Sequence, residues 1–202
     1  VVASDSVETR GISAGFVGVN ASGFNGQAES FSSGAAGNIT ITTPTLRLLQ
    51  GGAVGTPTSG SGPGGVINVQ ADLIEVDGFA TNFFLGEFRS GIYASSDSFS
   101  PLGRAGSVIL EADQIRVSNG GQIGASTLGF ADGGLVEVVN AGVITVEGVS
   151  GDGTQSGFYA RTDFLGAAGT VAIETNTLNV TDQGIVTART DSFGAAGTVR
   201  IR

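Results

Sequence analysis

The sequence predicts an all-β protein, a right-handed parallel β-solenoid (β-helix) of about six coils with three short strands per coil. Three observations predict it: a repeat unit of 28 residues, apolar residues that alternate with polar ones inside each repeat, and 35 glycines among 202 residues. One repeat is too short to bury its apolar face alone, so successive repeats must stack on each other. The right hand follows from the general rule for crossovers between parallel strands.

A glycine precedes the first strand of each repeat and sets the register. The spacings between these glycines are 28, 41, 28, 35 and 28 residues, which a unit of 28 with two insertions explains. The residues two and four positions after each glycine are always apolar, and such alternation indicates a strand with one buried face. The glycines are Gly37, Gly65, Gly106, Gly134, Gly169 and Gly197, and the apolar pairs are Ile39 and Ile41, Ile67 and Val69, Val108 and Leu110, Val136 and Val138, Val171 and Ile173, and Val199 and Ile201.

Two further strands complete each repeat. The second strand has the inward pairs Leu46 and Leu48, Ile74 and Val76, Ile115 and Val117, Ile144 and Val146, and Leu178 and Val180. In the fourth repeat this pair is shifted by one residue, after an extra residue near Asn140. The third strand has Val54 and Thr56, Ile92 and Ala94, Ile123 and Ala125, Phe158 and Ala160, and Val186 and Ala188.

We expect one domain spanning residues 1–202, because a solenoid has one continuous core. Residues 34–202 form the regular repeats, and residues 1–33 form an irregular entry coil. Within that coil, residues 11–14 resemble a third strand, which would place Val1 and Val2 in a second strand.

Two insertions interrupt the regular repeats, at residues 79–89 and 149–155. The first is rich in aromatic residues, namely Phe79, Phe83, Phe84 and Phe88. Such a loop either folds back over a flank of the solenoid or contacts a partner, since contiguous exposed apolar surface usually marks an interaction site. These four residues are therefore a candidate contact loop. The second insertion is polar and is expected to be a simple loop.

A phenylalanine lies near the same corner in most repeats: Phe31, Phe99, Phe130, Phe164 and Phe193. We expect these rings to stack along one corner and to stabilise it. The alternative is a platform on which sugars stack, which would require outward-facing rings.

The ends of the chain suggest an assembly mechanism. The sequence stops after one first strand, without a polar cap, and solenoids normally need caps over the exposed strand edge. We therefore expect copies to join head-to-tail into a filament, a type of contact that need not close. The candidate assembly interface is Val1, Val2, Ile12, Val199 and Ile201. The alternative is that the chain is a segment of a longer solenoid.

Composition restricts the function. A net charge of −9 argues against nucleic acid as a partner, and no apolar run is long enough for membrane insertion. The chain has no His, Cys or Lys, so we predict no catalytic residues, no metal site and no cofactor. Two acids could form a glycosidase pair, and the candidates are Glu75, Asp77, Glu111, Asp113, Glu137 and Glu147. Their distribution of about one or two per coil along outward positions favours a solvated face.

The repeats GAAGNITITTPTLRLLQGGAV, GGVINVQADLIEVDG, AGSVILEADQIRVSNGGQIGAST and AAGTVAIETNTLNVTDQG resemble those of filamentous-haemagglutinin-like exoproteins of the two-partner-secretion type, especially the large cyanobacterial ones. The resemblance covers residues 34–202 and implies a secreted β-helix that forms surface fibres or adhesins. The expected function is a structural or adhesive protein, located outside the cell or at its surface. Its expected partners are copies of itself, with surface glycans as a further candidate. The alternatives are a polysaccharide-active β-helix enzyme and a glycan-binding solenoid.

Overall fold

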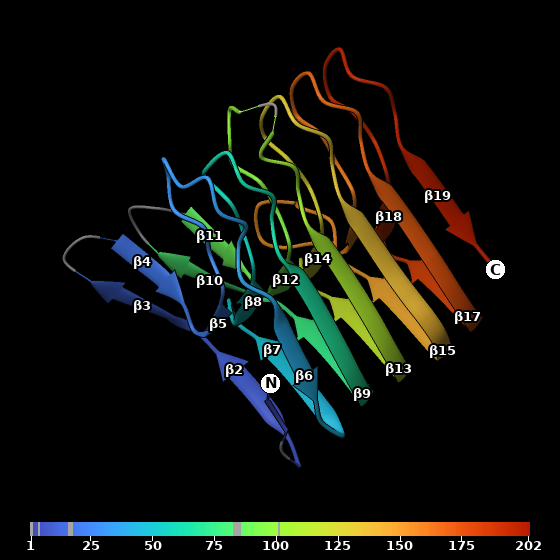
Figure 1. Ribbon diagram of the computed structural model, residues 1–202. Coiled ribbons are helices and arrows are strands. Elements are labelled where there is room, and N and C mark those ends of the chain that lie inside the picture. The colour runs from blue at the N-terminus through green and yellow to red at the C-terminus, as the bar shows by residue number, and fades with distance from the viewer. Residues whose placement is uncertain (1, 4, 16–17, 83–85, 101) are drawn as a thin grey trace.

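The computed structural model describes residues 2–3, 5–15, 18–82, 86–100 and 102–202 of the chain, and it is an all-β solenoid of about six turns (Figure 1). The coils advance from the N-terminus to the C-terminus with a right hand. The strands are β1 (Val2–Ala3), β2 (Val7–Arg10), β3 (Ile12–Gly15), β4 (Gly18–Ala21), β5 (Gly23–Asn25), β6 (Ile39–Thr42), β7 (Thr45–Leu49), β8 (Ala53–Gly55), β9 (Val66–Asp77), β10 (Phe79–Asn82), β11 (Gly86–Arg89), β12 (Gly91–Tyr93), β13 (Ser107–Ser118), β14 (Gln122–Gly124), β15 (Leu135–Glu147), β16 (Gly157–Tyr159), β17 (Thr170–Thr181), β18 (Ile185–Thr187) and β19 (Thr198–Ile201).

The first and second strands of each coil build one parallel sheet. In coils 1 and 2 they are separate, as β1 and β2 and then β6 and β7, whereas in coils 3 to 6 they merge into the long strands β9, β13, β15 and β17. The predicted inward residues are paired in register from coil to coil, as Ile67, Val108 and Val136 show. The predicted shift near Asn140 is confirmed by a break in register after Val138 and by a positive φ of 55° at Asn140.

The third strands build a second parallel sheet in the order β18, β16, β14, β12, β8 and β5. The apolar residues of both sheets meet in one interior, where Ile41, Leu46, Ile67, Ile92 and Phe158 are fully buried. The predicted fold and its aliphatic interior are therefore confirmed.

The entry coil differs from the prediction in two ways. Val2 pairs with Ile41, so β1 belongs to the first-strand position and not to the second. Ile12 begins strand β3, which pairs with β4 in an antiparallel hairpin, while β5 supplies the third strand instead. The prediction for residues 11–14 was wrong because alternation alone cannot distinguish a stacked strand from a hairpin arm.

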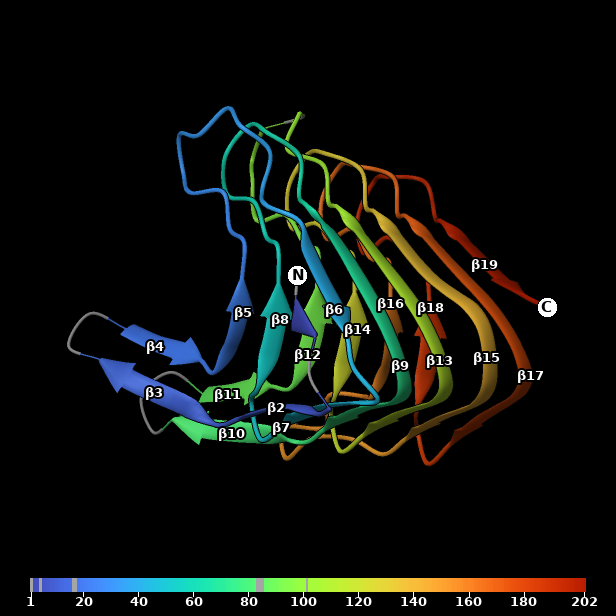
Figure 2. The ribbon, with the colours of Figure 1, turned by 60° about the horizontal axis from the view of Figure 1, so that its bottom comes forward.

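The long insertions leave the solenoid at one corner, between the second and third strands, and they occur in coils 1, 3 and 5. They are the hairpin β3–β4, the hairpin β10–β11 and the loop 149–155 (Figure 2). A glycine with positive φ opens each insertion and accepts a hydrogen bond of 3.0 Å from the backbone N–H of the serine that closes it. The glycine and serine pairs are Gly11 and Ser22, Gly78 and Ser90, and Gly148 and Ser156. The coils thus alternate between a long and a short form at this corner.

Candidate functional site

The C-terminal end of the solenoid is an open strand edge. Strand β19 pairs with β17 on one side, and no strand of the described residues pairs with it on the other. Val199 and Ile201 occupy inward positions but are 43% and 51% exposed. Such an edge presents both apolar side chains and unpaired backbone groups to a further coil.

The other predicted interface residues do not lie together with this edge. Val2 is in β1, at the opposite end of the first-strand sheet, and Val1 lies outside the described residues. Ile12 lies on the β3–β4 hairpin, where its Cγ2 atom packs beside Gly51 of coil 2. The two ends therefore share the first-strand position instead of presenting complementary strands.

The candidate contact loop forms the hairpin β10–β11. Phe79 pairs with Arg89 and Ala80 with Phe88, and both Phe79 and Phe88 are half-buried. Phe83 and Phe84 lie outside the described residues. The ring of Phe79 packs against Gly151 of the loop in coil 5, so this part of the insertion contacts the solenoid's own flank. A contact with a partner stays a prediction.

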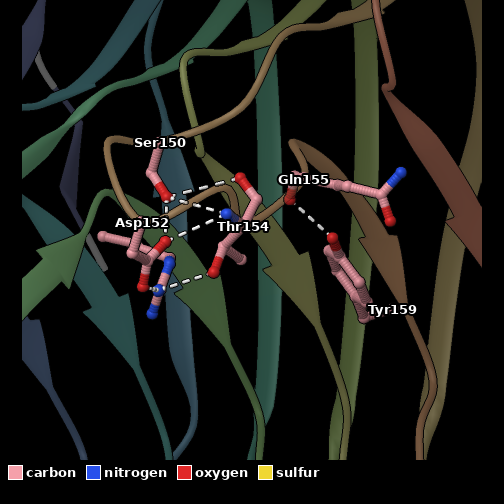
Figure 3. Close-up of polar contacts among 6 residues, drawn as sticks. Ser150, Asp152, Thr154, Gln155 and Tyr159 are labelled. Carbon is pink, nitrogen blue, oxygen red and sulfur yellow. Dashed lines mark hydrogen bonds and ion pairs between the residues drawn. The ribbon is translucent and has the colours of Figure 1, made fainter.

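The polar loop 149–155 is more organised than predicted (Figure 3). Ser150 donates a hydrogen bond of 2.6 Å from its Oγ to Oδ1 of Asp152, and the Thr154 N–H donates to the same oxygen at 2.9 Å. Arg89 forms an ion pair with Asp152 and donates a 2.7 Å hydrogen bond to Oγ1 of Thr154. Arg89 thereby links the coil 3 hairpin to the coil 5 loop across coil 4.

These contacts stabilise the charged form of Asp152. The hydrogen bonds from Ser150 and then from Thr154 hold the pKa of this carboxyl well below its usual range, with a smaller contribution from the Arg89 guanidinium. Asp152 is therefore charged at neutral pH, where it accepts the hydrogen bonds from Ser150 and Thr154 and pairs with Arg89.

A small cavity of about 170 Å³ opens on the outer face of the third-strand sheet. Gly124 of coil 4 lies in register between Tyr93 of coil 3 and Tyr159 of coil 5, so the missing side chain leaves a slot between two aromatic residues. The remaining lining residues are Ser95, Asp97, Gln122, Ser126, Leu128 and Arg161. Ligand sites typically combine such apolar walls with a few polar groups.

The tyrosines of this slot are fixed by backbone contacts. The Tyr159 hydroxyl donates to the carbonyl of Gln155 at 2.5 Å (Figure 3), and the Tyr93 hydroxyl donates to the carbonyl of Ser90 at 3.3 Å. Burial raises the pKa of both phenols, so they stay neutral. Arg161, which lines the slot, forms an ion pair of 2.7 Å with Asp163, so the positive charge of its guanidinium is neutralised.

The predicted phenylalanine stack is confirmed for three of its five members, and the corner faces solvent: Phe31 and Phe193 are 104% and 89% exposed. The rings of Phe99 and Phe130 meet edge-to-face with centroids 6.3 Å apart, and those of Phe130 and Phe164 with centroids 5.0 Å apart. We call the exposed apolar residues of this corner in coils 3 to 6 the apolar ridge. Its members and their exposed fractions are Phe99 (71%), Leu102 (71%), Leu128 (47%), Phe130 (38%), Phe164 (39%), Leu165 (46%) and Phe193 (89%).

Three of the candidate acids for catalysis have partners of their own. Glu75 forms an ion pair with Arg47 at 2.9 Å, and Glu147 with Arg116 at 2.7 Å. Asp77 accepts hydrogen bonds from Ser118 and Asn119 at 2.6 and 2.7 Å. Glu111 and Asp113 line an open groove with Asp72 at the corner between the first and second strands. Within the described residues, no group of three acids is arranged to hold a metal ion.

Two features of the sequence could have revealed more of these surfaces. The tripeptide Ser-Gly-Phe or Ser-Gly-Ile closes every insertion, at residues 22–24, 90–92 and 156–158, and marks the two-coil alternation. The positions Thr58, Ser96, Thr127, Thr162 and Thr190 recur in single bridges near the other end of the third strand, and the first four are fully buried. Thr58 and Thr162 each donate a 2.9 Å hydrogen bond to a backbone carbonyl of their own loop, which holds the ridge loops in place.

The described residues contain no helix of the length and apolar character needed to cross a bilayer. Comparison of the chain with protein family models, with curated proteins and with solved structures found no match.

Proposed function

We propose that this chain is a structural segment of an extracellular fibre, extended by coils of a neighbouring copy that stack on the open edge of β19. The observation that carries the proposal is the stacking of apolar residues in register through successive coils, which a further coil can continue. A coil of a neighbouring copy stacked on β19 would bury Val199 and Ile201 and would pair the backbone of β19 at the usual strand spacing of about 4.8 Å.

The remaining architecture suits a load-bearing or spacing role. Each coil is bonded to its neighbours by backbone hydrogen bonds in two sheets, and the interior is apolar along the rod. In repeat proteins each repeat contacts only its neighbours, and these contacts provide the stability. Further coils can therefore be added to the rod with the same contacts.

The test is the concentration dependence of association of the 202-residue chain, measured by analytical ultracentrifugation and electron microscopy. Ile201→Asp should abolish end-to-end association, because a carboxylate cannot be buried in the joint. Arg200→Asp is the matched control, since Arg200 alternates with the inward residues Val199 and Ile201 and should tolerate the change. A wild-type chain that stays monomeric, or an Ile201→Asp chain that forms filaments equally well, would contradict the proposal.

A second candidate function, adhesion to surface glycans, is favoured by the slot between Tyr93 and Tyr159. The neutral tyrosines offer a stacking surface to a sugar ring, and Asp97 and Arg161, which also line the slot, offer hydrogen-bonding groups. A screen of the chain on immobilised glycans tests it.

A further inference from the structure

The apolar ridge follows one corner of the solenoid from coil 3 to coil 6. It lies on the loops that connect the third strand of one coil to the first strand of the next, and these loops project together along one side of the rod (top of Figure 1). Its centre is a set of three rings in contact, Phe99, Phe130 and Phe164. The ridge therefore runs parallel to the solenoid axis, with a step at each coil.

The ridge is larger than the apolar patches expected on a monomer. A large side chain offers roughly 150–250 Å² of surface, so the exposed fractions of the seven residues correspond to roughly 600–1000 Å². The largest patch on a typical monomer is about 300–600 Å², and a standard protein interface buries about 800 Å² per partner. Exposed surface of this size indicates that something covers it.

The charges around the ridge fit a protein partner. Arg161 and Arg189 form ion pairs with Asp163 and Asp191 at 2.7 and 3.1 Å, and these pairs flank the rings. An apolar centre with a polar, charge-balanced rim is the usual anatomy of a protein interface. This corner is thus close to neutral, although the chain carries a net charge of −9, so repulsion between two copies is weakest here.

We propose that the apolar ridge is a lateral interface that pairs two copies of this solenoid side by side, in antiparallel orientation. A partner must match a ridge that repeats with the coil spacing, and a second copy has the same spacing by construction. A two-fold axis between coils 4 and 5 would place Phe130 opposite Phe164 of the other copy and would place the coil 3 loop opposite the coil 6 loop. This contact is isologous, the type found in most dimers.

The antiparallel orientation is favoured by charge. In a parallel, in-register pair each acid would face its own equivalent, including Asp97, for which the described part of the chain supplies no ion-pair partner. In the antiparallel pair, Asp97 of coil 3 lies on the same level as the ion pair of Arg189 and Asp191 in coil 6 of the other copy, which carries no net charge and does not repel it. This lateral contact goes beyond the end-to-end joint proposed above and does not require it.

The experiment uses the Ile201→Asp chain, so that end-to-end association does not contribute. Sedimentation equilibrium should show a dimer, and the triple variant Phe99→Ser, Phe130→Ser and Phe164→Ser should raise its dissociation constant by about tenfold or more, because buried aromatic anchors dominate interfaces. The far-ultraviolet circular dichroism spectrum of the variant, compared with that of its parent, checks that the solenoid is still folded. A triple variant that dimerises as well as its parent would overturn the proposal.

Cross-linking distinguishes the orientation, because the chain contains no cysteine of its own. Ser100→Cys places a thiol on the coil 3 loop and Ser192→Cys places one on the coil 6 loop. A mixture of the two variants should form a disulfide-linked heterodimer under mild oxidation, whereas each variant alone should not. Homodimers of each single variant would overturn the antiparallel arrangement. Thr177→Cys, on the exposed face of β17, is the control that should not cross-link.

A lipid surface is the competing occupant of the ridge. Sedimentation with neutral phosphatidylcholine vesicles should leave the chain in the supernatant. Vesicle binding that is lost in the triple variant, together with a monomeric chain in solution, would overturn the pairing of two copies.

Discussion

Val2 and Ile201 occupy the same register position of the first-strand sheet, six coils apart. The pairing runs from Val2 to Ile41 and onward through Val69, Leu110, Val138 and Ile173 to Ile201. Consequently, a copy joined end-to-end by stacking would carry the first strand twice, on β19 and on the following β1, while the second strand of that level would be missing. Two copies can stack without a gap in the second-strand position only if β19 of one copy or β1 of the next is displaced.

The shared register makes a tandem fusion testable. A fusion that joins Arg200 directly to Val2 keeps the alternation of inward and outward residues, whereas insertion of one extra residue at the junction reverses it for the following strand. We expect the in-register fusion to unfold in one transition at a higher temperature than the single chain. The variant with the extra residue should show two transitions by calorimetry. Equal melting curves for the two fusions would contradict this register.

The link between Arg89 and Asp152 should make stability depend on pH only in acid. The pKa of Asp152 is depressed in the folded chain, so its contribution is present above the ordinary carboxyl pKa of about 4 and is lost as the pH falls through the lower folded value. Asp152→Asn should therefore lower the melting temperature by a constant amount between pH 5 and pH 8, and the difference should shrink toward zero below about pH 4.

The control for this prediction is Asp182→Asn, because Asp182 is an exposed acid on the short turn of coil 6. A difference between wild type and Asp152→Asn that persists unchanged at low pH would show that the carboxylate charge is not what stabilises the loop.

The glycines that precede the first strands should not tolerate a side chain, because the backbones of neighbouring coils approach each other closely there. A Cβ atom on Gly134 would lie 1.9 Å from the carbonyl oxygen of Gly106 in the preceding coil. Gly134→Ala should destabilise the chain by about 1–3 kcal/mol or more, since the backbone must shift to relieve the overlap. Gly34→Ala is the matched control, because its nearest neighbour would be Oγ of Ser32 at 3.7 Å, and it should change stability by less than about 0.5 kcal/mol. Urea denaturation measures both.

In the slot on the third-strand sheet, the tyrosine rings and the tyrosine hydroxyls should contribute differently to glycan binding. If glycans bind there, Tyr159→Ala should abolish binding, whereas Tyr159→Phe should retain most of it, because the ring remains and only the hydroxyl bonded to Gln155 is lost. Gly124→Val should block the slot by filling the space between the tyrosines. Glycan binding that survives Gly124→Val would place the ligand elsewhere. Isothermal titration calorimetry with a ligand from the glycan screen gives the affinities.

Most of the fold could be predicted from the sequence, because the solenoid interior imposes the same demand on every coil. Residues such as Ile67, Val108 and Val136 recur at fixed distances from a glycine, and all three are fully buried in register. The entry coil could not be predicted in this way. Ile12 alternates with polar neighbours just as a stacked strand would, yet it belongs to a hairpin whose pairing is local and antiparallel.

The surfaces were harder to predict, since outward positions obey no shared constraint. The stacking of Phe99, Phe130 and Phe164 followed from their recurrence, but their exposure depends on how far the loops project. The slot was missed because it arises from a gap at Gly124 between residues that are far apart in the sequence. The link from Arg89 to Asp152 spans two coils and has no sequence signature.

The placement of insertions in every second coil limits how such a chain can grow. The ring of Phe79 reaches Gly151 because the intervening coil has only a short turn at that corner. Two neighbouring coils with long insertions would compete for the same space. Duplication of a single coil that carries a long insertion would therefore bring two insertions into collision, whereas duplication of a long and a short coil together would preserve their spacing.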